Sequence, residues 1–205
     1  MIRILAGEKR GMVLRVARTG AVRPTAANAR QVLFDILGAR VAGTRWLDLY
    51  AGSGAVGLEA LSRGATDCVM VESARRCVET IRANIARLGY EDRCRLFSFP
   101  VERALKKLAA GGQAFDVVFL DPPYTGEEAK RCLLAIGSSP APLLVSSAES
   151  LVVAQLSVHS ESQPAYGTLV LERERRIGDT RLCFFRPGHP TPGAATSELS
   201  TTSAE

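Results

Sequence analysis

A glycine-rich turn between a predicted strand and a predicted helix is the feature that most limits the folds open to this chain. Residues 46–57 read Trp-Leu-Asp-Leu-Tyr-Ala-Gly-Ser-Gly-Ala-Val-Gly. The apolar start is typical of a buried strand, and the helix that follows is expected to run through residues 58–63 and to end at Gly64. A strand, a tight turn and a helix in this order open a βαβ unit. The sequence therefore predicts an α/β protein with a ligand site at this turn.

Predicted strands and helices alternate along the rest of the chain. The predicted strands lie near residues 46–50, 68–72, 93–97, 116–120 and 151–154. The predicted helices are residues 74–88 and an amphipathic helix over Ala27–Val41, with Val32, Leu33, Ile36 and Leu37 facing inward. Residues 2–6 and 12–17 alternate as a short hairpin around Gly7–Gly11. This order implies a parallel sheet with right-handed crossovers, preceded by a small β-hairpin.

The chemistry of the glycine-rich turn favours a cationic ligand. Gly52-x-Gly54-x-x-Gly57 fits the dinucleotide fingerprint, with Glu72 about twenty residues on as the ribose carboxylate. Asp48, at the strand end, would repel a pyrophosphate. S-adenosylmethionine (AdoMet) carries an ammonium and a sulfonium, so it suits this acid better than NAD does. Glycines then allow close backbone approach, and Glu72 is expected to bind the ribose hydroxyls.

A second motif follows the apolar run at residues 115–120. Asp121-Pro122-Pro123-Tyr124 offers a carboxylate, two rigid turn residues and an aromatic face. The Asp121 carboxylate and the Pro122 carbonyl can accept hydrogen bonds from an exocyclic amine, and Tyr124 can stack on the ring that carries that amine.

These two motifs together resemble those of class I AdoMet-dependent methyltransferases that act on exocyclic amino groups. Further segments resemble one family of this class, the RsmD-type enzymes, which methylate guanine N2 in small-subunit (16S) ribosomal RNA. Those segments are Arg3–Gly11, Arg23-Pro24-Thr25, Leu58–Ala65 and Gly178–Leu182. The resemblance covers roughly residues 1–186. It therefore includes the N-terminal segment, which lies outside the two methyltransferase motifs.

The resemblance implies a fold, a cofactor and a set of site residues. The fold is a Rossmann-like, mostly parallel sheet with an antiparallel last strand, closed by strands near residues 165–172 and 180–186. The catalytic residues would be Asp121, Pro122 and Tyr124, and the cofactor would contact Asp48, Ala51, Gly52, Gly54, Glu72 and Val101. AdoMet would be converted to S-adenosylhomocysteine without a metal. The RNA would be methylated within the small ribosomal subunit or an assembly intermediate.

The chain departs from the family pattern at three places. Gln31 stands where the family usually carries Glu, and Gln155 occupies a segment that lacks the acid commonly found after the fifth strand. Residues 98–101 contain no Asp or Asn to accept from the adenine amine. Adenine recognition is therefore expected to rest on backbone atoms or on packing by Val101.

Charge is concentrated at the N-terminus. Residues 1–45 carry nine basic and two acidic side chains, whereas the whole chain has a net charge of only +5. A basic segment beside a base-modifying site predicts phosphate contacts. The expected RNA-binding residues are Arg3, Lys9, Arg10, Arg23 and Arg30. We therefore expect a basic RNA-contacting extension over residues 1–45, an AdoMet-binding catalytic domain over residues 46–187 and a disordered tail over residues 188–205.

Composition favours a cytoplasmic enzyme, which we expect to be a monomer. Five cysteines are scattered without a C-x-x-C pair, and two histidines are too few to suggest a metal site. Charged residues occupy the N-terminus where a signal peptide needs an apolar stretch, and no apolar run is long enough to cross a membrane.

Two other interpretations stay open at this point. One is an amino methyltransferase acting on DNA adenine N6 or on a protein glutamine. Asp rather than Asn at position 121 disfavours glutamine, and the lack of a sizeable recognition domain disfavours DNA. The other is a NAD-binding Rossmann oxidoreductase, which Asp48 and the Pro-Pro turn disfavour.

Overall fold

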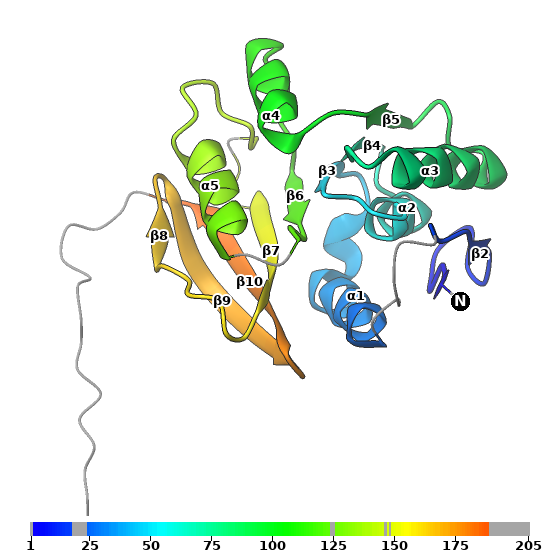
Figure 1. The fold of residues 1–205 in the computed structure, drawn as a ribbon, viewed down its shortest axis with the longest axis horizontal. Coiled ribbons are helices and arrows are strands. Elements are labelled where there is room, and N and C mark those ends of the chain that lie inside the picture. Colours follow the sequence, from blue (N-terminus) through cyan, green and yellow to red (C-terminus); the bar gives the residue numbers. More distant parts are fainter. Residues whose placement is uncertain (1, 18–23, 124–125, 146, 148, 189–205) are drawn as a thin grey trace, which may run out of the picture.

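The computed structural model describes residues 2–17, 24–123, 126–145, 147 and 149–188. Within these residues an eight-stranded sheet has the order β5-β4-β3-β6-β7-β10-β9-β8, and β1 and β2 form a separate hairpin (Figure 1). The strands are β1 Ile2–Arg3, β2 Val13–Leu14, β3 Arg45–Leu49, β4 Asp67–Val71, β5 Cys94–Phe97, β6 Val117–Leu120, β7 Leu151–Ser157, β8 Ala165–Tyr166, β9 Leu169–Ile177 and β10 Thr180–Pro187. The helices are α1 Pro24–Leu37, η1 Gly38–Val41, α2 Ala55–Ser62, α3 Arg75–Leu88, α4 Val101–Ala110 and α5 Gly126–Gly137.

The sheet confirms the predicted topology. Strands β3 to β7 run parallel, and β10 lies antiparallel between β7 and β9. The order of the strands reverses between β3 and β6, so the chain leaves these neighbouring strands in opposite directions across the sheet. A crevice opens at such a switch point, outside the carboxyl ends of the strands. The glycine-rich turn follows β3 and the Asp-Pro-Pro segment follows β6, so both predicted motifs meet there.

Two hydrophobic cores cover the two faces of the sheet. The side chains of β3 alternate between them: Trp46 packs in the core formed with α1, α2 and α3, and Leu47 and Leu49 pack in the core formed with α4 and α5. This alternation follows from the two-residue period of a strand, which sends successive side chains to opposite faces. Because both faces are covered, the central strands are mostly apolar, and the buried Asp48 of β3 is an exception.

Helix α1 begins and ends earlier than predicted. The expected helix over residues 27–41 is α1, followed by the 3-10 turn η1. Pro24 is the first helical residue, a position where its missing N–H costs no hydrogen bond. Leu33 and Leu37 are buried as expected. Phe34, absent from the expected inward face, is also buried and stacks on Trp46 with ring centroids 5.7 Å apart.

The strand predicted near residues 165–172 is divided in two. Gly167 adopts φ +61 and separates β8 from β9, which continues to Ile177. The far part of β9 is the charged run Glu172–Arg176, and all five of these residues are exposed. The prediction stopped short because this segment extends beyond β8 and has no apolar alternation to reveal a strand.

The N-terminal hairpin has only two residues in each strand because the chain between them bonds to α2 instead. Both oxygens of the fully buried Glu59 carboxylate are used: Oε2 accepts from Leu5 N at 2.7 Å, and Oε1 accepts from Ala6 N at 3.0 Å. The Ser62 hydroxyl accepts from Lys9 N at 3.0 Å and donates to the carbonyl of Ala6 at 2.6 Å. Two segments that carry the family resemblance are therefore in direct contact.

Candidate functional site

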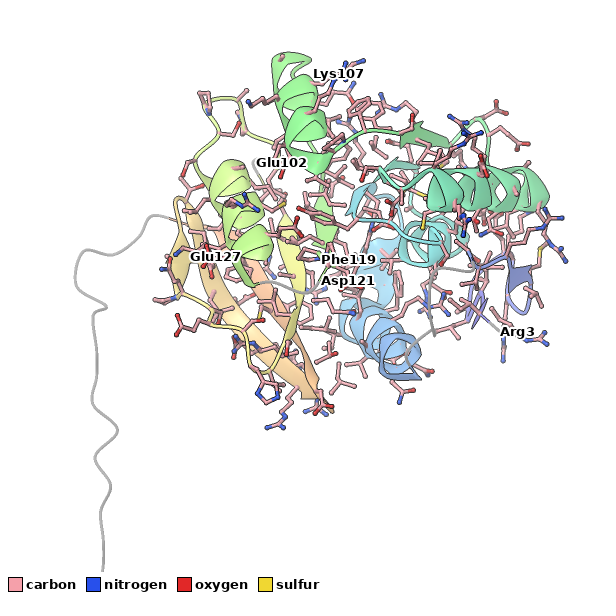
Figure 2. All side chains as sticks on the ribbon, in the orientation of Figure 1. Arg3, Glu102, Lys107, Phe119, Asp121 and Glu127 are labelled. Carbon is pink, nitrogen blue, oxygen red and sulfur yellow. The ribbon has the colours of Figure 1, made fainter. Side chains whose placement is uncertain are left out.

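A cleft of about 1050 Å³ lies at the carboxyl ends of β3, β4, β6 and β7. Its walls come from the glycine-rich turn, the starts of α3, α4 and α5, the Asp-Pro-Pro segment, the end of β7 and the turn between β9 and β10. Figure 2 shows Asp121 after β6, Glu102 at the start of α4 and Arg3 on the hairpin. Among the predicted site residues, Gly52, Glu72, Val101, Asp121 and Pro122 line this cleft.

The Glu72 carboxylate binds the glycine-rich turn through a hydrogen bond. Tyr50, Gly52 and Gly54 all have positive φ, with values of 61, 58 and 76. Glu72 Oε2 accepts from Gly52 N, and its Oε1 accepts from Ser73 N and Ala74 N, each at 2.8 Å. The carboxylate thus bonds to the turn after β3 and to the N-terminal end of α3 at once. Glu72 lines the cleft, and its contact with a ribose stays a prediction.

Asp48 lies behind the turn and is not among the described residues that line the cleft. Its side chain is buried, and Oδ2 accepts from Gly57 N at 2.9 Å. Burial raises the pKa of Asp48 to about 7, the hydrogen bond from Gly57 opposes that rise, and the negative charges of Asp121 and Glu72 add to it. Ala51 and Gly54 also lie behind the lining, where Gly54 N donates to the Ala51 carbonyl at 2.7 Å.

Gly57 shows why the third glycine of the motif is required. A Cβ at this position would lie 2.7 Å from Cys68 Sγ and 2.7 Å from Met70 Cε. Helix α2 therefore packs against β4 at a distance that only glycine allows.

Asp121 and Pro122 occupy the cleft after β6. Asp121 is exposed, and its Oδ2 accepts from Gln155 Nε2 at 3.1 Å. Gln155 comes from β7 and lines the same cleft. Tyr124 and Arg23, both predicted site residues, lie outside the described residues.

The described lining of the cleft is acidic. It contains five carboxylates and, within the described residues, no lysine or arginine; the acids are Glu72, Glu102, Asp121, Glu128 and Asp179. Glu102, Glu128 and Asp179 were not among the predicted site residues. Glu102 and Glu128 belong to helices that were not assigned from sequence, and Asp179 appeared only within the segment Gly178–Leu182 that carries the resemblance. Glu102 directly follows residues 98–101, the segment in which the sequence offers no acid for an adenine amine. One Glu128 oxygen is buried without a hydrogen-bond partner.

The N-terminal segment lines the cleft with apolar residues, and its described basic side chains lie outside the lining. Ile2, Val16 and Ala17 form part of the cleft wall, whereas Arg3 and Arg10 are exposed and Lys9 is half-buried, with its ammonium 5.7 Å from the centre of the Tyr90 ring.

Arg30 departs from its predicted role at the surface. It is only 5% exposed, and its guanidinium donates to the carbonyls of Arg3 at 2.7 Å and Ala55 at 3.4 Å. These bonds tie α1 to β1 and α2, so this side chain cannot reach a phosphate without breaking them. The error came from counting charge along the sequence, which carries no information about burial.

No group of three side chains suited to a metal ion occurs in the part of the chain that the structure describes, where all five cysteines are free thiols. None of the described helices is long and apolar enough to cross a membrane.

Comparison with known proteins places the chain in a family. The family described as "Conserved hypothetical protein 95" matches residues 2–186. "Putative rRNA methyltransferase YlbH" of Bacillus subtilis is 30% identical over 185 residues, which cover 90% of this chain and 98% of that protein. "Ribosomal RNA small subunit methyltransferase D" of Escherichia coli K12 is 37% identical over 123 residues, 60% of each chain.

A solved structure agrees with these relatives. "Putative methyltransferase yhhF" from Escherichia coli has a TM-score of 0.76 and 29% identity, over 91% of this chain and 98% of its own. The family match spans the hairpin, the glycine-rich turn, the Asp-Pro-Pro segment and β10 together. The chain therefore belongs to the Conserved hypothetical protein 95 family, the RsmD family that its sequence resembles.

Proposed function

We propose that this protein transfers a methyl group from AdoMet to the exocyclic N2 of a guanine in small-subunit ribosomal RNA. The observation that carries the proposal is the acidic cleft at the switch point of the sheet, with Asp121 and Pro122 in its lining. The names of the relatives, ribosomal RNA methyltransferases, support the substrate class. The guanine N2 target rests on the sequence resemblance.

The residues present fit AdoMet better than a dinucleotide. AdoMet supplies a methyl group activated by a positively charged sulfonium. Five carboxylates and no described basic side chain favour such a cation, and the same charges repel a pyrophosphate. Glu72 would accept from the ribose hydroxyls, and Val101, which is 5% exposed and lines the cleft, would offer an apolar wall to the adenine ring.

Asp121 and Pro122 would orient the target amine. The lone pair of the guanine N2 amine is delocalised into the ring, so the amine is a weak nucleophile. Hydrogen bonds from its two N–H groups to the Asp121 carboxylate and the Pro122 carbonyl would turn the lone pair toward the methyl group. Alignment of this kind can contribute ~7 kcal/mol or more to lowering the barrier. Asp121 then accepts the departing proton or passes it to water.

The charge distribution explains how a polyanion would reach an acidic cleft. Phosphates are repelled by the lining, so only a flipped base would enter, at a cost of a few kcal/mol. Tyr124, outside the described residues, is proposed to stack on that base and to return ~1–3 kcal/mol. Arg3, Lys9 and Arg10 lie on the hairpin beside the cleft wall and would hold the phosphates. We propose that a single protomer performs these steps.

The test is a methylation assay with labelled AdoMet and small ribosomal subunits from a strain that lacks this methylation. We expect N2-methylguanosine as the labelled nucleoside after complete digestion of the RNA. Naked 16S RNA in a parallel reaction shows whether the assembled particle is the substrate. Label in adenine, or in protein only, would overturn the guanine assignment, and tight NAD binding without methyl transfer would overturn the enzyme class.

A further inference from the structure

We propose that Arg173 and Arg175 of β9 form a second phosphate-binding surface for the ribosomal RNA, here named the β9 surface. This inference rests on the proposed function for the identity of the RNA, because it adds a contact to the same substrate. It gives a role to the charged run Glu172–Arg176, most of which lies beyond the strand that the sequence predicted.

The two arginines of the β9 surface point to one face of the sheet. Arg173 is paired with Phe184 and Arg175 with Leu182. Residues directly opposite each other on antiparallel strands have their side chains on the same face. Phe184 and Leu182 are buried in the core formed with α1, α2 and α3. Both guanidinium groups therefore project from the α1 face, and both side chains are exposed.

The two acids of the same run are paired with arginines of β10. Glu172 Oε2 accepts from Arg186 Nε at 2.8 Å, and Glu174 Oε1 accepts from Arg181 Nη1 at 3.3 Å. The arginines of the β9 surface, in contrast, form no ion pair with any residue that the structure describes. The charge left unpaired on this part of β9 is therefore positive.

The β9 surface lies at the open edge of the sheet. Strand β8 pairs only with the first two residues of β9, so no described strand covers the charged run. Charged side chains on an edge strand also prevent pairing with other chains, and charge of either sign does this. The selective pairing of the acids needs a further reason. Exposed guanidinium groups match the geometry of phosphate, which they bind through two parallel hydrogen bonds.

A row of paired residues leads from the cleft to the β9 surface. Asp121 Oδ2 accepts from Gln155 Nε2 of β7 at 3.1 Å. Gln155 is paired with Leu182 of β10, and Leu182 with Arg175. Three strand spacings of ~4.8 Å therefore separate Asp121 from Arg175, about 14 Å along the sheet. One strand of a duplex carries a phosphate every ~3.4 Å of its axis, so this distance corresponds to a few nucleotides.

The hairpin and the β9 surface lie on the same face of the sheet, on opposite sides of the cleft. Ile4 and Leu14 of the hairpin are buried in the same core as Leu182 and Phe184. The hairpin bonds to α2, which packs on β3 and β4, whereas β9 lies beyond β7 and β10. Figure 1 shows β2 and β9 on opposite sides of β6. An RNA strand that crosses the cleft can therefore contact both basic surfaces, with its target base between them.

The experiment measures the binding of a labelled 16S fragment by fluorescence anisotropy at several salt concentrations. The double variant Arg173→Ala/Arg175→Ala should reduce the slope of log K against log salt by ~1.4–1.8, the value for two phosphate contacts. Arg173→Lys/Arg175→Lys keeps both charges and should keep most of the slope. The matched control is Lys106→Ala/Lys107→Ala, which removes two exposed charges from α4, on the other face of the sheet, and should keep the wild-type slope.

Three results would overturn the β9 surface. One is a wild-type slope in the double alanine variant, and another is an equal loss in the control, which would assign the effect to net charge. The third is self-association of the alanine variant in sedimentation velocity together with a wild-type slope, which would assign the arginines to protection of the sheet edge.

The binding assay does not depend on methyl transfer. In the methylation assay, the double alanine variant should raise the KM for ribosomal subunits with little change in kcat at saturation, because its residues lie outside the cleft lining. A reduced salt slope in a protein that methylates no guanine would leave the β9 surface intact and refute the proposed function. Guanine methylation by the wild type with an unchanged slope in the variant would refute the β9 surface alone.

Discussion

At the scale of single residues, the catalytic proposal depends on Asp121. Its carboxylate is exposed in the cleft, and its neighbours on β6 are fully apolar, so it has no role in the core. We expect Asp121→Ala to lower kcat at least ~10²-fold, the scale for losing a positioned acceptor of protons. The affinity for AdoMet, measured by calorimetry, should change little because Gly52 and Glu72 lie on another wall of the cleft.

Glu127→Ala is a suitable control for that experiment. Glu127 is an exposed acid in the first turn of α5, outside the lining of the cleft. Its removal should leave the methylation rate unchanged. Methyl transfer at the normal rate by Asp121→Ala would show that the amine is oriented by other groups.

Asp48 links stability to pH. Its pKa is raised from 3.8 to about 7 by burial, so the native state binds a proton more tightly than the unfolded state does. Its stabilising contribution is complete below the unfolded-state pKa and is lost as the pH rises toward 7. The free energy of unfolding of Asp48→Asn should therefore fall less between pH 4 and pH 7 than that of the wild type. At pH 8 the variant should be more stable than the wild type by ~1–3 kcal/mol.

Urea denaturation at several pH values measures this difference. The control is Asp116→Asn. Asp116 is a half-buried acid directly before β6, the strand that pairs with β3, and its substitution should not remove the pH dependence. Parallel pH dependence in wild type and Asp48→Asn would mean that Asp48 is ionised in the native state throughout.

At the scale of elements, the hairpin and α2 form one unit. Gly7 has φ +82, and a Cβ there would lie 1.7 Å from the carbonyl oxygen of Ser62 in α2. Gly11, in the same hairpin, has φ +84 and would meet nothing within 4 Å. Both positions have a positive φ, which strains any residue other than glycine, but only Gly7 lacks room for a Cβ. Comparing alanine at the two positions therefore separates the cost of backbone strain from the cost of overpacking.

We expect Gly7→Ala to destabilise the protein by ~3 kcal/mol or more, through overpacking added to strain. Gly11→Ala should cost ~1–2 kcal/mol through strain alone. Thermal denaturation followed by circular dichroism measures both. Equal losses would show that the hairpin can leave α2 without affecting the fold.

At the scale of the whole molecule, charge is divided between an acidic cleft and a basic hairpin beside it. Arg10 is exposed on that hairpin, whereas Lys107 lies at the far end of α4, away from Arg3 (Figure 2). We expect Arg10→Ala to weaken RNA binding and to reduce the slope of log K against log salt by ~0.7–0.9, the value for one phosphate contact. Lys107→Ala should leave both unchanged.

Fluorescence anisotropy of a labelled 16S fragment at several salt concentrations measures the slopes. Equal slopes for wild type and Arg10→Ala would mean that the hairpin has a structural role only and does not bind RNA phosphates. Arg30→Ala should instead lower stability, because its guanidinium bonds two carbonyls inside the protein.

The sequence by itself determined the succession of the central strands along the chain, the glycine-rich turn, the Asp-Pro-Pro segment and the family, because each depends on neighbouring residues or on a short period. The short apolar runs of β3, β4, β6 and β7 favoured buried strands, and the two motifs follow such strands. Their meeting at the edge of the sheet then follows from parallel topology.

Only the tertiary structure decided which distant residues touch. Glu59 bonds Leu5 across 54 positions of the chain, and Gln155 bonds Asp121 across 34. Arg30 is buried although its segment is the most basic in the protein, and Glu102 and Glu128 reach the cleft from helices not assigned in advance. Local patterns report which face of an element is apolar, but they carry no record of which polar side chains pack together once those faces are buried. That choice depends on how the helices and strands are packed around the sheet, which brings five carboxylates to one cleft.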